Sequence, residues 1–180
     1  MKTERRPGNS GRRSFYDTVM ENLATGLQAG IRLLREEEMA AASALIRRVF
    51  AEFEAPEYAP QGTETFYRFI APEALAEQLR RGTMLMWGAF RQETPVGIIA
   101  LTHRDHISLL FVDKSCHRRG IARALFARAC ESCRTGPAIT RLTVNSSPYA
   151  VGIYRKLGFT AIGPERTTDG IRYTPMEYHL

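Results

Sequence analysis

The chain has 180 residues and a net charge of +6 at neutral pH, and 44% of its residues are hydrophobic. This length suffices for one domain with a sizeable core, and the composition excludes a disordered, disulfide-rich or membrane-spanning chain, so we expect no membrane partner. The first 13 residues contain five basic residues and one glutamate, and they therefore carry +4 of the net charge. The rest of the chain has no stripe of basic residues interleaved with aromatic residues, so we expect no nucleic-acid partner either.

The first 29 residues differ in character from the rest of the chain. Residues 1–13 are polar, basic and glycine-containing, a composition that predicts disorder. A short helix over about residues 15–26 is predicted from the helical spacing of four apolar residues, Phe15, Val19, Met20 and Leu23. We therefore divide the chain into an N-terminal extension, residues 1–29, and a single domain, residues 30–180.

The chain contains three cysteines, Cys116, Cys130 and Cys133. An odd number of cysteines without a secretory signal sequence is typical of the reducing cytoplasm, where we expect this protein to work. Cys130 and Cys133 have the spacing of a metal-binding or redox pair, but they fall in a predicted helix and no second Cys or His pair accompanies them. We therefore expect no metal ion.

The domain is predicted to begin with a short strand, Ile31–Leu34, and a long helix, Glu36–Phe53. Apolar residues lie on one side of that helix at Met39, Ala42, Leu45, Ile46, Val49 and Phe50. Two prolines and a glycine predict a loop over residues 56–62. After Pro72 the pattern predicts a second helix, Glu73–Arg80.

Three apolar runs with short connections predict antiparallel hairpins; they are Met84–Phe90, Val96–Thr102 and His106–Val112. The last run is apolar on both faces, as in a central strand that is covered on both sides. The later elements are predicted to be a helix from Gly120, a strand Leu142–Asn145, a helix Tyr149–Leu157, a strand from Phe159 and a strand Ile171–His179. This order predicts a mixed α/β fold.

A basic loop joins the run His106–Val112 to the next helix, and its sequence is His117-Arg118-Arg119-Gly120-Ile121-Ala122. Backbone N–H groups at a helix start have no intrahelical partner and lie at the positive end of the helix dipole, so they can hold an anion. The loop has neither the G-x-x-x-x-G-K-[ST] nor the G-x-G-x-x-G phosphate pattern. Considered alone, it fits a phosphate site and an ordinary strand-helix junction equally well.

A second motif favours the phosphate site. It is Asn145-Ser-Ser-Pro-Tyr-Ala-Val-Gly-Ile-Tyr154-Arg-Lys-Leu-Gly158-Phe159, a strand end followed by a helix that we expect to start with a serine cap and Pro148 and to stop at Gly158 in a left-handed conformation. Together the two motifs resemble those of the GNAT N-acetyltransferases, whose acetyl-CoA loop reads Gln/Arg-x-x-Gly-x-Gly/Ala and whose later helix ends in Tyr-x-x-x-Gly-Phe. The resemblance covers about residues 30–180, and His117 departs from it.

The resemblance implies a GNAT-type fold, a mixed and mostly antiparallel central sheet with helices on both faces, and acetyl-CoA as the co-substrate. It assigns the pyrophosphate to the loop backbone and its arginines, and the pantetheine arm to a strand edge. The residues implied for cofactor binding are Leu110, Phe111, Val112, His117, Arg118, Arg119, Gly120, Ile121, Ala122, Arg123, Asn145 and Tyr154. Asn145 is interpreted either as a buried amide between diverging strands or, preferably, as a pantetheine ligand.

Two residues are candidates for proton transfer. Tyr154 falls on the family's proton-donor position, and a side chain with a pKa of about 10 keeps its proton at neutral pH; the alternative is a core tyrosine. His106 shares a strand face with Leu110 and Val112 by simple alternation, and it falls where histone-acetylating members carry a catalytic glutamate. Histidine can accept a proton at neutral pH; the alternative is a histidine that caps the adjacent turn.

We expect an enzyme, monomeric or homodimeric, that moves an acetyl group from acetyl-CoA to a primary amine of a small molecule or protein. The alternative is a catalytically silent acyl-CoA-binding or sensing module. The basic loop is consistent with both hypotheses, whereas Tyr154 favours the enzyme. The acceptor is expected to contact residues 50–82 and 164–175. The acidic candidates for binding its ammonium group are Glu52, Glu54 and Glu57, although a solvated helix end is the favoured interpretation of these three.

Overall fold

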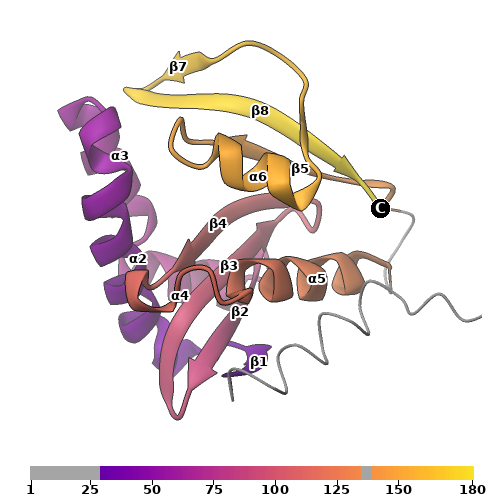
Figure 1. Ribbon diagram of the computed structural model, residues 1–180. Helices are drawn as coiled ribbons and strands as arrows, with labels where there is room; N and C mark the ends of the chain where they lie inside the picture. The colour runs from indigo at the N-terminus through magenta and orange to yellow at the C-terminus, as the bar shows by residue number, and fades with distance from the viewer. Residues whose placement is uncertain (1–28, 135–138) are drawn as a thin grey trace, which may run out of the picture.

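The computed structural model describes residues 29–134 and 139–180, and it shows a twisted sheet with helices on both faces (Figure 1). The strand order is β1-β2-β3-β4-β5-β8-β6, and β7 pairs with β8. Only β4 and β5 run parallel within the described sheet. The predicted mixed, mostly antiparallel sheet is therefore confirmed. The helix predicted over residues 15–26 lies outside the described residues.

The first part of the domain supplies an edge strand and the helices of one face. Its elements are β1 (Ala29–Leu33), the 3-10 turn η1 (Glu36–Glu38), α2 (Met39–Phe53), the 3-10 turn η2 (Ala55–Glu57), α3 (Pro60–Phe69) and α4 (Pro72–Arg80). Both α3 and α4 begin with a proline at the first position, where the missing N–H costs no helical hydrogen bond. The loop predicted over residues 56–62 is therefore wrong from Pro60 onward.

Three strands form an antiparallel meander, β2 (Met84–Arg91), β3 (Thr94–Thr102) and β4 (His106–Val112), as predicted. The register between β3 and β4 shifts between Leu101↔Ile107 and Ala100↔Leu109, which leaves Ser108 as an extra residue in β4. Such a bulge reverses the alternation of side chains along the strand. Residues before Ser108 therefore lie on the face opposite to the one that simple alternation from Val112 predicts.

The last part of the domain contains α5 (Ile121–Arg134), β5 (Arg141–Ser146), α6 (Val151–Leu157), β6 (Thr160–Ala161), β7 (Arg166–Thr168) and β8 (Ile171–His179). Gly158 ends α6 with φ 103°, the left-handed cap that was predicted. The predicted start of this helix at Tyr149 is wrong, because the Ser147 carbonyl accepts hydrogen bonds from the N–H groups of Ala150 and Val151 and closes a turn first. Strand β7 was not predicted, since three residues are too few to show alternation.

Two cores lie on opposite faces of the sheet. One contains residues of α2 and α4, among them Phe50 and Leu75, and the other contains residues of α5 and α6, among them Leu125 and Tyr154. Helix α5 packs closely on β3 at Gly97. A Cβ built on this glycine would lie 2.8 Å from the side chain of Ile121. In the described ranges no helix is both long and apolar enough to cross a bilayer.

Candidate active site

The two parallel strands at the centre of the sheet diverge soon after they meet. Strands β4 and β5 pair at only two positions, His106↔Thr143 and Ile107↔Val144, although β4 continues to Val112 and β5 to Ser146. Two adjoining cavities lie along this divergence, and both are lined by Glu54, Leu110, Phe111 and Ala150. The two cavities therefore share a wall.

The first cavity, which we call the loop cavity, has a volume of about 440 Å³ and is lined by the start of α5. Gly120 has φ 80° and Arg118 has φ 59°, so the loop turns twice through left-handed conformations before α5 begins at Ile121. Nothing lies within 4 Å of a Cβ built on Gly120, so the loop backbone is open to a ligand. The free N–H groups of the first turn of α5 are available to an anion here.

Side chains from α2 hold the segment that follows β4 in place. Arg48 forms an ion pair of 2.6 Å with Asp113, whose carboxylate also accepts hydrogen bonds from the backbone and hydroxyl of Ser115. These interactions, with Ser115 the larger cause, lower the pKa of Asp113 to about 2. Lys114 pairs with Glu52 of α2. The loop is thus fixed to the helix that ends beside both cavities.

His117, the residue that departs from the family pattern, also supports the loop. Its Nε2 lies 2.8 Å from the carbonyl oxygen of Val112, to which it donates, and its ring lies 5.5 Å from that of Phe53. The side chain therefore ties the loop back to the end of β4. One of the backbone carbonyls assigned to the pantetheine arm already has this partner.

Most of the residues predicted to bind the cofactor do line the loop cavity; they are Leu110, Phe111, Val112, His117, Arg118, Gly120, Ile121, Ala122 and Arg123. Arg119 is exposed and does not line it. Asn145 and Tyr154 line the second cavity instead. Asn145 is exposed, which excludes its interpretation as a buried amide.

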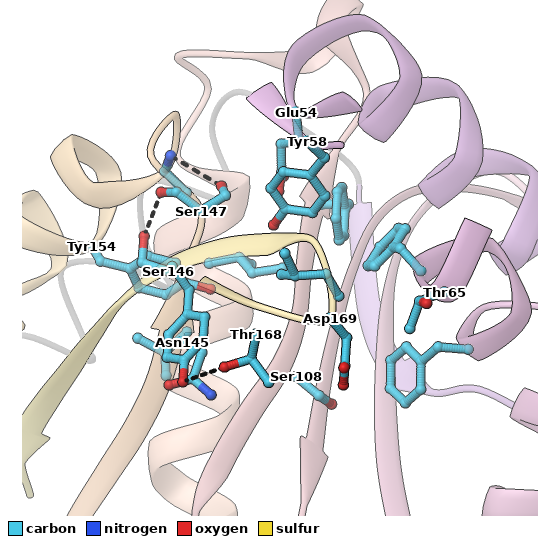
Figure 2. Close-up of a pocket in the computed structure, with 18 residues that line it drawn as sticks. Glu54, Tyr58, Thr65, Ser108, Asn145, Ser146, Ser147, Tyr154, Thr168 and Asp169 are labelled. Atoms are coloured by element: carbon cyan, nitrogen blue, oxygen red, sulfur yellow. Dashed lines mark hydrogen bonds between the residues drawn. The ribbon is translucent and has the colours of Figure 1, made fainter. Parts of the chain in front are cut away.

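The second cavity, which we call the hairpin cavity, has a volume of about 350 Å³ and lies between α3, the diverging strands and the β7-β8 hairpin (Figure 2). Tyr154 reaches it from α6. Its ring packs edge-on against Phe159 at 5.2 Å, and among the described residues its hydroxyl has no hydrogen-bond partner. Burial, and secondly the charge of Glu54, raise the Tyr154 pKa, so the side chain keeps its proton.

His106 does not line either cavity. Ile107 packs on the α5 side of the sheet, as Leu110 and Val112 do, because Ser108 is the extra residue between them. The predicted shared face of His106 with Leu110 and Val112 is therefore wrong. His106 instead contacts Thr143, with Nδ1 2.8 Å from the hydroxyl oxygen, and burial lowers its pKa.

Glu54 is the site residue that the sequence interpretation placed in solvent. It is partly buried at the C-terminal cap of α2, and it lines both cavities. Burial raises the pKa of its carboxyl group to about 7, against a smaller opposing effect of a hydrogen bond from Ser147. The signal for its position was present, because Glu54 lies four residues after the buried Phe50 and so continues the apolar face of the helix.

The other two glutamates of this segment have ion-pair partners. Glu52 pairs with Lys114, and Glu57 pairs with Arg172 at 3.1 Å. The negative charge of Glu54 secondarily raises the pKa values of Tyr58 and Tyr149 as well as that of Tyr154. Glu54 therefore lies at the centre of a group of three tyrosines, with a carboxyl group that can change protonation state near neutral pH.

Comparisons with known proteins agree with this geometry. A family model described as "Acetyltransferase (GNAT) domain" matches residues 54–180. The peptidyl-lysine N-acetyltransferase YjaB of Salmonella typhimurium is 32% identical over 78 residues, which are 43% of this chain and 51% of YjaB. The chain thus aligns with about half the length of this relative.

Solved structures share the fold. The PaiA N-acetyltransferase of Thermoplasma acidophilum, in complex with coenzyme A, has a TM-score of 0.71 at 22% identity, covering 86% of this chain and all (100%) of that one. A GCN5-related N-acetyltransferase of Rhodopseudomonas palustris has a TM-score of 0.71 at 20% identity, covering 87% and 98%. Because the family model matches more than two thirds of the 180 residues, this chain belongs to the GNAT acetyltransferase family.

Proposed function

We propose that the protein transfers an acetyl group from acetyl-CoA, held in the loop cavity, to a primary amine held in the hairpin cavity. The observation that carries this proposal is the shared wall of the two cavities, where Glu54 and the β4 backbone at Leu110 and Phe111 meet both. Acetyl-CoA supplies the acetyl group as a thioester. The protein must then hold the cofactor, remove a proton from the amine and stabilise the departing thiolate.

The start of α5 suits the phosphates of the cofactor. Its open backbone at Gly120, the helix N-terminus and the side chains of Arg118 and Arg123 together favour a multiply charged anion. The apolar part of the cavity, formed by Val112, Ile121 and their neighbours, suits the less polar pantetheine arm. The residues present therefore fit the cofactor that the family uses.

Glu54 is proposed as the general base. An amine enters mainly as an ammonium ion, and a carboxylate beside it both attracts the cation and can accept its proton. A base acts best when its pKa is near the working pH, and the Glu54 pKa of about 7 meets that condition. His106, the base predicted from the sequence, remains an untested prediction, but its position outside both cavities favours Glu54.

Tyr154 is proposed as the general acid. Its hydroxyl keeps its proton at neutral pH because burial raises its pKa, and it faces the cavity without an internal partner among the described residues. It can donate a hydrogen bond, and then the proton, to the sulfur as the carbon-sulfur bond breaks. Because a thiolate is a stable leaving group, this donor assists the step.

The experiment is an assay of free thiol release from acetyl-CoA against a panel of primary amines, with single-turnover transfer and CoA affinity measured for Tyr154→Phe. Loss of the hydroxyl should slow transfer roughly 10-fold to 100-fold and leave CoA affinity nearly unchanged. Tyr178→Phe is the matched control, because Tyr178 also packs against Phe159 but does not line the cavity. CoA binding without thiol release for any amine would support the silent acyl-CoA-binding module instead.

A further inference from the structure

The hairpin cavity contains a second carboxylate that acetyl transfer itself does not use. Asp169 lines this cavity at the tip of the β7-β8 hairpin, on the side remote from the loop cavity, which it does not line. Figure 2 shows its side chain pointing from the hairpin towards the cavity. No ion pair or hydrogen bond to Asp169 exists within the described part of the chain. This carboxylate is therefore available to a ligand.

The local sequence sets the backbone of Asp169. Asp169 and Gly170 connect Thr168 to its partner Ile171, with φ values of 51° and 77°. A two-residue hairpin turn of this kind needs positive φ at both central positions, and Asp-Gly is one of the pairs that adopt it most easily. The turn therefore fixes the backbone of Asp169, although the residue is exposed.

Contacts with the opposite wall fix the hairpin in space. A Cβ on Gly62 of α3 would lie 2.3 Å from the carbonyl oxygen of Gly170, so the two backbones touch where both residues are glycine. Arg172 of β8 pairs with Glu57 at 3.1 Å and with Glu165 at 2.8 Å. Figure 1 shows the start of β8 meeting α3. Backbone contact and the ion pair between Arg172 and Glu57 thus hold the hairpin against α3 and η2.

The lining between the two carboxylates suits a cation with an alkyl chain. Aromatic rings of Tyr58, Phe66, Phe69 and Tyr173 line the cavity, and its lining contains two carboxylates and no lysine, arginine or histidine. Aromatic faces attract cations and pack against methylene groups. Phe50 supports two of these rings, at 4.1 Å from Phe66 and 5.4 Å from Tyr58.

We infer that the acceptor is a small diamine, a molecule with two ammonium groups joined by an alkyl chain. One amine lies at Glu54 and Tyr154 and is acetylated, while the second, still charged, binds Asp169. The ammonium group at Glu54 loses one proton to the carboxylate, and the neutral nitrogen then forms its bond to the acetyl carbon and releases a second proton to water. The carbon-sulfur bond breaks, the sulfur takes a proton from Tyr154, and the distal ammonium takes no part in that exchange. This inference rests on the proposed acetyl transfer, and it favours a small diamine over a lysine side chain, which would bring only one ammonium group into a cavity with two carboxylates.

The test compares α,ω-diaminoalkanes of three to six carbons with n-alkyl monoamines of equal carbon number, and with a short lysine peptide. For the parent protein we expect the best diamine to have a kcat/KM at least 10-fold above its matched monoamine and above the peptide. Asp169→Asn should bring the ratio of diamine to monoamine kcat/KM close to one, mainly through a higher KM for the diamine. Asparagine also adopts this turn before glycine, so the variant keeps the hairpin.

Glu93→Gln is the matched control, because Glu93 is an exposed carboxylate in the turn of the β2-β3 hairpin, outside the hairpin cavity. Equal rates for diamine and monoamine, a preference that persists in Asp169→Asn, or a peptide that outperforms every diamine would each overturn the inference. Calorimetry with CoA present separates the two proposals. If Asp169→Asn weakens diamine binding at least 10-fold, the result supports the diamine site even where no thiol is released. If thiol is released with monoamines alone, the result supports acetyl transfer and overturns the diamine inference.

Discussion

Replacing Glu54 with glutamine tests the site through stability before any substrate is added. The carboxyl pKa is 4.5 in its ordinary state and about 7 in the folded protein, because burial disfavours the charged form. A difference of this size corresponds to about 3 kcal/mol of unfolding free energy. The folded state prefers the protonated acid because its pKa is raised. The contribution of Glu54 to stability is therefore complete below pH 4.5 and is lost as the pH rises through about 7.

The measurement is urea unfolding of the parent and Glu54→Gln at intervals from pH 5 to pH 8. Glutamine stays neutral, so the variant should gain stability relative to the parent as the pH rises, by about 2–3 kcal/mol in all. Other titrating groups cancel in this difference. Glu93→Gln controls for the loss of one negative charge at an exposed position. A parent-variant difference that does not change with pH would refute the raised pKa.

The same variant tests the proposed base in catalysis. For the parent, kcat/KM should rise with pH and level off above about pH 7, as Glu54 loses its proton. Glu54→Gln should lose this acidic limb and about 100-fold or more of the rate. His106→Ala should keep the limb, because His106 lies outside both cavities. Loss of the limb in His106→Ala and its retention in Glu54→Gln would return the role of base to the histidine.

Two glycine substitutions test the cavities separately. Gly120→Val should reduce by at least 10-fold the affinity for CoA, measured by the rise in melting temperature, whereas Gly82→Val, at another positive-φ position with open surroundings, should keep it. Gly62→Ala should push the hairpin from α3, cost about 1–3 kcal/mol of stability and raise KM for the amine. Gly152→Ala, a helical glycine with open space, should instead gain about 0.5–1 kcal/mol.

The sheet, most of the helices and the turn that leads into α5 could be predicted because their signals are local, whereas α3 was missed. Apolar spacing in α2 and the three short-connected runs of the meander determine which faces are buried. Gly158 could be assigned for the same reason, since a left-handed helix end is a property of one residue and its neighbours. The turn after Ser147 was missed because a turn and the first turn of a helix involve nearly the same residues here. Both would use the Ser147 carbonyl as an acceptor close to the start of α6.

The position of His106 shows that the alternation of side chains in a sequence does not reveal a β-bulge. The pattern His106-x-Ser108-x-Leu110 reads as one face of a regular strand, and a bulge leaves no mark in such a pattern. The register of β4 depends on its pairing with β3, in which Ser108 has no opposite residue. One unpaired residue was enough to place His106, the base predicted from the sequence, on the other face of the sheet.

The hairpin cavity, which we propose as the acceptor site, was the least predictable part because it is made by contacts between distant segments. Glu57 and Arg172, which join its walls, are 115 residues apart in the chain, and the touching glycines at 62 and 170 are nearly as far apart. The dipeptide Asp169-Gly170 marks a turn by itself, but it does not say what the turn faces. The backbone contact with α3 is what places Asp169 at the hairpin cavity. If this cavity holds the amine as proposed, we expect substitutions at Asp169 that preserve the turn to change amine selectivity without disturbing the fold.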